Sequence, residues 1–140
     1  MIIVAEILQL KIGIQGISDC QRILIESKAS FQRLHQFIQE IYEWENHHLH
    51  EFIVNEMVRI APENGESIRR EMIENNLHRD DETLLSEEET PLSKYLNMKG
   101  DSLVYRYDFG DDWRYDIVLE KIKEEKYIEE YDDFPVKFED

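Results

Sequence analysis

The sequence predicts an α+β fold in which a mostly antiparallel sheet packs on one main helix. Residues 7–14 alternate apolar and polar side chains, as a half-buried strand does, and residues 30–44 repeat apolar side chains at helical spacing. Two strand pairs, at 50–60 and 103–120, each fold about a short polar turn. The order is of the ββαββ type with an insertion before a C-terminal hairpin, and it favours a β-grasp-like arrangement in which the sheet wraps the helix.

The first three elements follow from local patterns. Alternate positions from Leu8 to Ile14 place aliphatic side chains on one face of the first strand. A turn at 16–19 leads to a second strand over 21–26, which we expect to be antiparallel to the first. Ser30 is a favoured N-cap for the main helix. The apolar face of that helix consists of Phe31, Leu34, Phe37, Ile38, Ile41, Tyr42 and Trp44.

The second half of the chain is predicted as two hairpins separated by an insertion. Strands at 50–54 and 57–60 form the first of these hairpins. Residues 63–90 form an acidic insertion, with a helical pattern through Ile68, Met72 and Ile73 and a mobile loop after it. Pro91 follows Thr90 and starts a further short helix.

The chain is predicted to hold one α+β domain, over residues 1–123, and an acidic tail. The last hairpin pairs strands 103–109 and 113–120 across a glycine turn. Residues 124–140 then hold eight acidic and two basic residues. We expect this tail either to dock on the domain or to extend freely.

The net charge disfavours several classes of partner. The 140 residues include 32 acidic and 16 basic side chains, for a net charge of −16. Such a chain is repelled by nucleic-acid phosphates and by anionic lipid, so direct nucleic-acid binding is disfavoured and no membrane partner is expected. Cys20 is the single cysteine, which fits a reducing compartment, and no signal or membrane-spanning pattern is present. We therefore expect a cytoplasmic protein.

A histidine motif follows the main helix, at residues 47–51. If these residues are extended, His48 and His50 share one face, and two imidazoles at that spacing can bind a divalent metal. Alternatively, the two histidines are an exposed or hydrogen-bonded pair at a helix end, where they complement the helix dipole. The motif alone leaves both interpretations open.

A second motif surrounds the glycine turn of the last hairpin. Asp108, Asp111 and Asp112 lie within five residues and precede Trp113. Close carboxylates repel one another and can attract Mg²⁺ or Ca²⁺. Asp and Gly are also ordinary turn residues for backbone reasons, and this second interpretation is favoured.

The remaining candidates are weaker. Cys20 lies in a predicted turn, with no histidine placed beside it, and is interpreted as structural or incidental. His35, next to Leu34 on the main helix, is interpreted as a helix-surface or core-edge residue. Trp44 and Trp113 are expected to anchor the core rim or to wall a pocket beside the polar motifs.

Four segments resemble the plasmid open-reading-frame-3-like family, also labelled TnpR-type passenger proteins of insertion elements. The longest of them contain the two polar motifs, and together the segments span about residues 8–122. They are 8–12 with Gly16, 34–39, 44–52, and 105–113 continuing through 117–120.

The resemblance implies a small α+β domain without an established activity, associated with mobile elements. Family members usually carry a histidine two residues after the tryptophan of the last motif, where this chain has Tyr115. A three-histidine metal site with His48 and His50 would therefore be incomplete. The family often continues into a segment that contains cysteine and proline, where this chain has its acidic tail.

We interpret the chain as a non-enzymatic binding or scaffold domain that needs no cofactor and has an unidentified partner, such as another protein. Its predicted ligand surface consists of His48, His50, Asp108, Asp111, Asp112, Trp113 and Tyr115. The alternative is a hydrolase or nuclease-like enzyme in which a divalent metal held by His48, His50 and Asp108 activates water, aided by the other two aspartates. A third interpretation is an accessory of a mobile element that reaches DNA through another protein.

Overall fold

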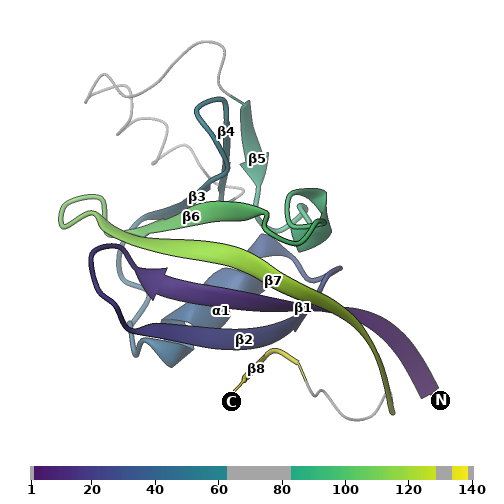
Figure 1. Cartoon of the computed structure of the whole chain (residues 1–140). Coiled ribbons are helices and arrows are strands. Elements are labelled where there is room, and N and C mark those ends of the chain that lie inside the picture. The colour runs from purple at the N-terminus through teal and green to yellow at the C-terminus, as the bar shows by residue number, and fades with distance from the viewer. Residues whose placement is uncertain (1, 63–82, 129–133, 139–140) are drawn as a thin grey trace.

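The computed structural model describes residues 2–62, 83–128 and 134–138 (Figure 1). Within these residues an eight-stranded sheet accompanies one α-helix and one short 3-10 helix, which confirms the predicted α+β class. The helices are α1 (Phe31–Ile41) and η1 (Leu92–Lys94). The strands are β1 (Ile2–Ile14), β2 (Cys20–Glu26), β3 (His50–Ile53), β4 (Val58–Ala61), β5 (Thr83–Ser86), β6 (Ser102–Tyr107), β7 (Trp113–Ile128) and β8 (Val136–Lys137).

The strands lie side by side in the order β5–β4–β3–β6–β7–β1–β2–β8. Neighbours are antiparallel except β4 and β5, which run parallel. The hairpins β1–β2, β3–β4 and β6–β7 agree with the sequence analysis. The β-grasp-like order is not confirmed, because β1 lies inside the eight-stranded sheet between β7 and β2 and is antiparallel to both.

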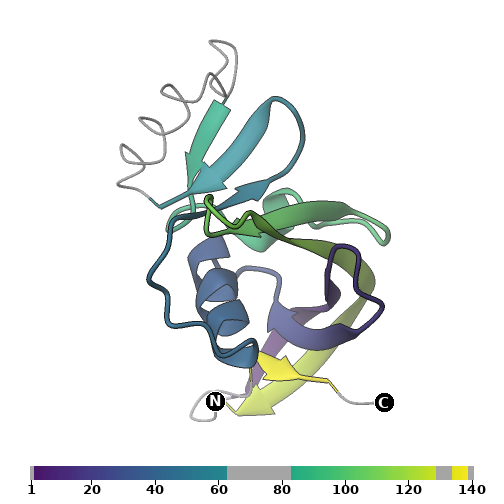
Figure 2. The same ribbon diagram turned by 90° about the vertical axis from the view of Figure 1, so that its left-hand side faces the viewer.

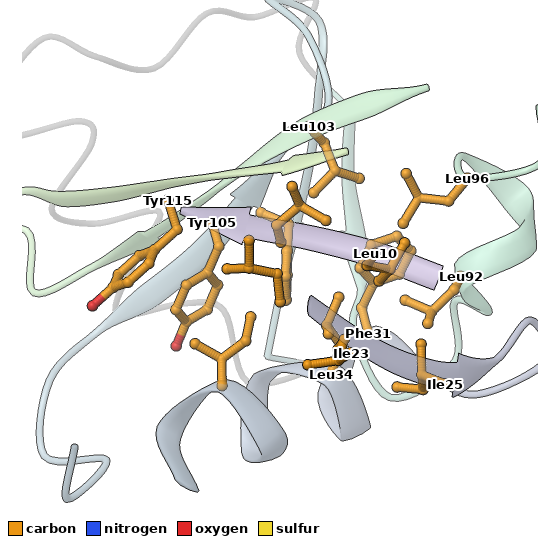
Figure 3. Close-up of a cluster of buried hydrophobic side chains, with 14 of the residues drawn as sticks. Leu10, Ile23, Ile25, Phe31, Leu34, Leu92, Leu96, Leu103, Tyr105 and Tyr115 are labelled. Atoms are coloured by element: carbon orange, nitrogen blue, oxygen red, sulfur yellow. The ribbon is translucent and has the colours of Figure 1, made fainter. Parts of the chain in front are cut away.

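The core lies between α1 and one face of the sheet, which curves around the helix (Figure 2). Phe31 and Leu34 of α1 belong to one cluster of fully buried side chains with Leu10, Ile23 and Tyr105 of the strands (Figure 3). Burying a side chain of this size contributes about 1.5–3 kcal/mol. None of the helices in the described part of the chain has the length and apolar composition needed to cross a bilayer.

Ser30 caps α1 as the sequence predicts. Its Oγ accepts a hydrogen bond of 3.1 Å from the backbone N–H of Arg33. We expect Ser30→Ala to lower the free energy of unfolding, measured by urea denaturation, by about 1 kcal/mol, because that N–H loses its acceptor. Ser18→Ala, at an exposed turn position, is the control and should change it by less than about 0.5 kcal/mol. Equal losses in the two variants would contradict the capping role.

β7 is longer than the predicted strand. It runs to Ile128 and pairs with β1 from end to end, so it enters the segment that the sequence analysis assigns to an acidic tail. A β-bulge interrupts this pairing: Gln9 lies opposite Lys121 while Leu10 lies opposite Leu119, which leaves Glu120 as the extra residue.

Part of the predicted acidic insertion belongs to the sheet. Thr83–Ser86 form β5, where a loop was expected, because β4 offers a free edge with which they pair in parallel. The following turn returns to α1, where the Glu87 carbonyl accepts a hydrogen bond from the Gln32 N–H. The helical pattern expected at Ile68, Met72 and Ile73 lies outside the described residues.

Candidate functional site

The two polar motifs found in the sequence are neighbours in the sheet. His50 at the start of β3 lies opposite Tyr107 at the end of β6. One step further, the Asp108 N–H donates a hydrogen bond of 2.8 Å to the Leu49 carbonyl. The loop before β3 and the turn after β6 therefore lie side by side. We call these two segments, residues 42–49 and 108–112, the loop pair.

His48 and His50 have different environments. His48 lies before β3, is 54% exposed in its side chain, and has its Nε2 3.7 Å from a carboxylate oxygen of Asp108. His50 is buried, and its Nε2 lies 2.7 Å from an oxygen of Glu87. The strand alternation that would align the two histidines starts only at His50. Among the described residues, no group of three or more His, Cys, Asp or Glu side chains is placed to hold a metal ion.

The three aspartates of the turn are used in different ways. Asp108 accepts a hydrogen bond of 3.1 Å from the Gly110 N–H and so stabilises the turn. Partial burial would raise the pKa of the Asp112 carboxyl, but this carboxyl accepts hydrogen bonds from Arg106 at 2.6 Å and Arg114 at 3.1 Å, and these lower its pKa. Asp111 is exposed at the tip of the turn.

Left-handed backbone conformations are concentrated in the loop pair. Among the described non-glycine residues, positive φ angles occur at Glu43 (57°), Asn46 (56°), Asp108 (60°) and Asp112 (57°), and all four lie in these two segments. For an L-residue this conformation costs about 1–2 kcal/mol. Such residues cluster at ligand-binding and active sites, where the surrounding structure holds them in place.

Aromatic side chains support the loop pair from the sheet. Trp44 and Trp113 are both half-buried, with ring centroids 5.8 Å apart. The Trp44 Nε1–H donates a hydrogen bond of 2.7 Å to the hydroxyl of Tyr115. Tyr115 is fully buried, and burial raises the pKa of its hydroxyl. Both tryptophans pack as partly buried side chains against the core cluster, as expected for anchors of the core rim.

A closed ring of hydrogen bonds anchors the same loop to α1. The Gln39 Nε2–H donates to the Tyr105 hydroxyl at 2.9 Å, and that hydroxyl lies 2.6 Å from Nδ1 of His35. The His35 Nε2 lies 2.9 Å from Oδ1 of Asn46, whose backbone N–H donates to Gln39 Oε1 at 2.8 Å. Because an amide oxygen only accepts, His35 carries its proton on Nε2 and accepts from Tyr105 at Nδ1.

His35 is neutral in this setting. Burial, and then the nearby ring of His50, lower the pKa of His35 to about 3. The two imidazole rings stack with centroids 3.5 Å apart and planes 2° apart. His35 is therefore a buried core residue, and the sequence-based interpretation as a helix-surface or core-edge residue understates its burial, which comes from β3 and β6 packing over α1.

Two further polar residues were missed in the sequence. Glu87 was assigned to an acidic loop, but its side chain is 3% exposed and meets His50. Glu51 is fully buried and pairs with Arg59 and with Arg106, whose guanidinium also stacks over Phe109 at 4.1 Å. Nothing in the local pattern distinguishes these two glutamates from exposed ones, because their partners come from other strands.

Comparison with known proteins places this chain in a family. Residues 6–136 match the sequence model described as plasmid pRiA4b ORF-3-like protein. The chain belongs to this ORF-3-like family. A solved structure described as a protein of unknown function, MM3350 from Methanosarcina mazei Go1, is 32% identical, with a TM-score of 0.71. The match covers 96% of this chain and 69% of that one. No curated protein matches.

The family resemblance gives Tyr115 a particular interest in this ORF-3-like chain. It occupies the position where the resemblance implies a histidine, yet its hydroxyl is engaged by Trp44 and its ring is fully buried. Tyr115 therefore supports Trp44 of the loop pair from the core, and His50 is buried against His35 and Glu87. The predicted surface residues that reach solvent are His48, Asp111 and Asp112, with Asp108 and Trp113 half-buried beside them.

Proposed function

We propose that this ORF-3-like chain is a non-catalytic binding domain and that the loop pair is its ligand surface. The observation that carries the proposal is that the four described non-glycine residues with a left-handed backbone conformation lie in these two adjacent segments. They are Glu43, Asn46, Asp108 and Asp112. The ring of hydrogen bonds through His35 and the Trp44–Tyr115 bond hold one of these segments from below. A surface fixed in this way loses little conformational entropy on binding.

The surface combines features that suit a protein partner. His48 and Asp111 are exposed polar groups, and the half-buried Trp113 offers aromatic area beside them. Partly exposed tryptophans with a polar rim are typical of energetically important interface residues. We infer a reducing, cytoplasmic setting from the single Cys20, and any link to a mobile element would run through a protein, because the net charge of −16 opposes contact with DNA.

The metal-dependent alternative receives less support. It needs His50 and Asp108 to bind one ion together with His48. In the structure, His50 is engaged by Glu87, and only His48 lies close to Asp108. A binding role makes use of the contacts that the loop pair already has.

Affinity capture with a matched pair of baits tests the proposal. We expect the double variant His48→Ala/Asp111→Ala to capture a specific partner in a yield at least about tenfold lower than the wild type, since both side chains are exposed in the loop pair. Quantitative mass spectrometry of proteins captured from the source cells measures this.

The control bait is Lys28→Ala/Met98→Ala, which changes two exposed side chains elsewhere. It should retain the same partners as the wild type, and both double variants should keep the wild-type melting temperature to within a few degrees. If the loop-pair variant captures every partner in wild-type yield, the loop pair is not the binding surface.

A further inference from the structure

A pocket lies on the face of the sheet opposite α1. Leu8 and Leu10 of β1 point into the core, so Gln9 between them faces the other side. The pocket has a volume of about 490 Å³, which is within the range of small-molecule sites. The residues that line it include Gln9, Arg22, Lys99, Gly100, Glu120 and Lys121.

The pocket is basic in an otherwise acidic chain. Its lining includes three cations, Arg22, Lys99 and Lys121, and one carboxylate, Glu120, for a net charge of +2, whereas the whole chain carries −16. The negative charge of Glu120 is already paired. Partial burial would raise the pKa of its carboxyl, but hydrogen bonds from Arg22 and Gln9 lower that pKa. In the part of the chain that the structure describes, neither lysine forms an ion pair.

The β-bulge in β7 builds this charge arrangement. In a regular strand, Glu120 and Lys121 would point to opposite faces. With Glu120 as the extra residue, both it and Lys121 oppose Gln9, and all three line the pocket. Bulges commonly redirect side chains next to functional sites.

Gln9 supplies the observation that points to a ligand. The residue is 4% exposed, and its Nε2–H donates a hydrogen bond of 3.1 Å to Glu120. That bond fixes the orientation of the amide, so the other atom, Oε1, is the oxygen. This buried oxygen has no hydrogen-bond partner in the described structure. An unpaired buried acceptor is costly, and a donor that reached it from the pocket would recover the cost.

We propose that this pocket binds a small phosphate ester that also carries a hydroxyl group. The phosphate lies between the ammonium groups of Lys99 and Lys121, and the hydroxyl donates to Oε1 of Gln9. Lysine is a common phosphate ligand because it supplies a compact point charge, and two lysines match a dianion. A neighbouring pocket of about 550 Å³ shares both lysines and adds Ile122 and Lys123, which gives room for the rest of the ligand.

An NMR titration of the full chain with glycerol 3-phosphate tests the proposal. We expect saturable shifts of the Gly100 and Lys121 amide signals at constant ionic strength, with a dissociation constant of about 1 mM. Lys99→Gln/Lys121→Gln should raise that constant at least about tenfold, because the site then lacks both ammonium groups that attract the phosphate. Lys28→Gln, at a lysine 74% exposed outside the pocket, should leave it unchanged.

Two further ligands separate the roles of phosphate and hydroxyl. Methyl phosphate lacks the hydroxyl and should bind the wild type several-fold more weakly than glycerol 3-phosphate. Gln9→Met removes the acceptor and should abolish that preference. Lactate keeps a hydroxyl but carries one charge on a carboxylate, and it should bind more weakly than either phosphate.

The absence of saturable shifts, or equal binding by the wild type and the double lysine variant, would overturn the site. Equal binding of methyl and glycerol phosphate by the wild type would overturn the role of Gln9.

Discussion

Glu51→Gln should lower the free energy of unfolding by about 3 kcal/mol. The Glu51 side chain has no exposed area and pairs with the guanidinium groups of Arg59 and Arg106. Removing one member of a buried ion pair leaves the other charges uncompensated, whereas an exposed pair contributes little. Arg106 also holds Asp112 of the loop pair, so the effect should extend to the proposed ligand surface. Urea denaturation at pH 7 measures the change.

Glu40→Gln is the matched control for this charge change. Its side chain is 63% exposed and lies 4.0 Å from Arg33, so we expect a loss below about 0.5 kcal/mol. Salt offers a second readout, because screening acts on exposed charges and much less on buried ones. The Glu51→Gln effect should therefore persist in about 1 M NaCl. If the two variants were equally stable, the buried ion pair would have no stabilising role.

The elements that the sequence predicted are those whose signal is local. The alternation at 8–14 reports one buried face, and the helical spacing after Ser30 reports another, so β1 and α1 could be located without knowledge of their neighbours. β5 has four residues and exists because β4 presents a free edge, and no local pattern encodes that edge. The same reason explains why β7 exceeds its predicted length: its second half pairs with the start of β1.

The candidate site was predictable as a location but not as a set of side-chain directions. Both motifs lie at strand ends that are neighbours in the sheet, which is why they gather on one surface. Which of their residues face inward depends on how the strand ends pack against α1 and on the turn after β5. His50 and Tyr115 turn inward, and Glu87 arrives from a segment that looked like solvent-exposed acid. The directions of these side chains therefore depend on pairing between strands that are distant in the sequence, and no local pattern reports that pairing.

Acid should destabilise the wild-type chain more than it destabilises His35→Gln. The pKa of His35 is lowered to about 3 by burial and by the neighbouring His50, against 6.5 for an ordinary histidine. Between these pH values the imidazole of His35 is protonated in the unfolded chain and neutral in the folded chain. The contribution of neutral His35 to the free energy of unfolding is therefore fully present above about pH 6.5 and is lost as the pH falls toward 3. Between pH 7 and pH 4 this loss amounts to about 3 kcal/mol.

Urea denaturation of both proteins at pH 7 and pH 4 measures this difference. Glutamine cannot titrate, so the drop in the free energy of unfolding should be about 3 kcal/mol smaller in the variant, even though it starts about 1–3 kcal/mol less stable because the ring through Tyr105 and Asn46 is disturbed. His47→Gln changes a histidine that is 70% exposed and should keep the wild-type pH dependence. If His35→Gln and the wild type lost equal stability in acid, protonation of His35 would not be what weakens the fold, and its hydrogen-bond ring would have to tolerate a charged imidazole.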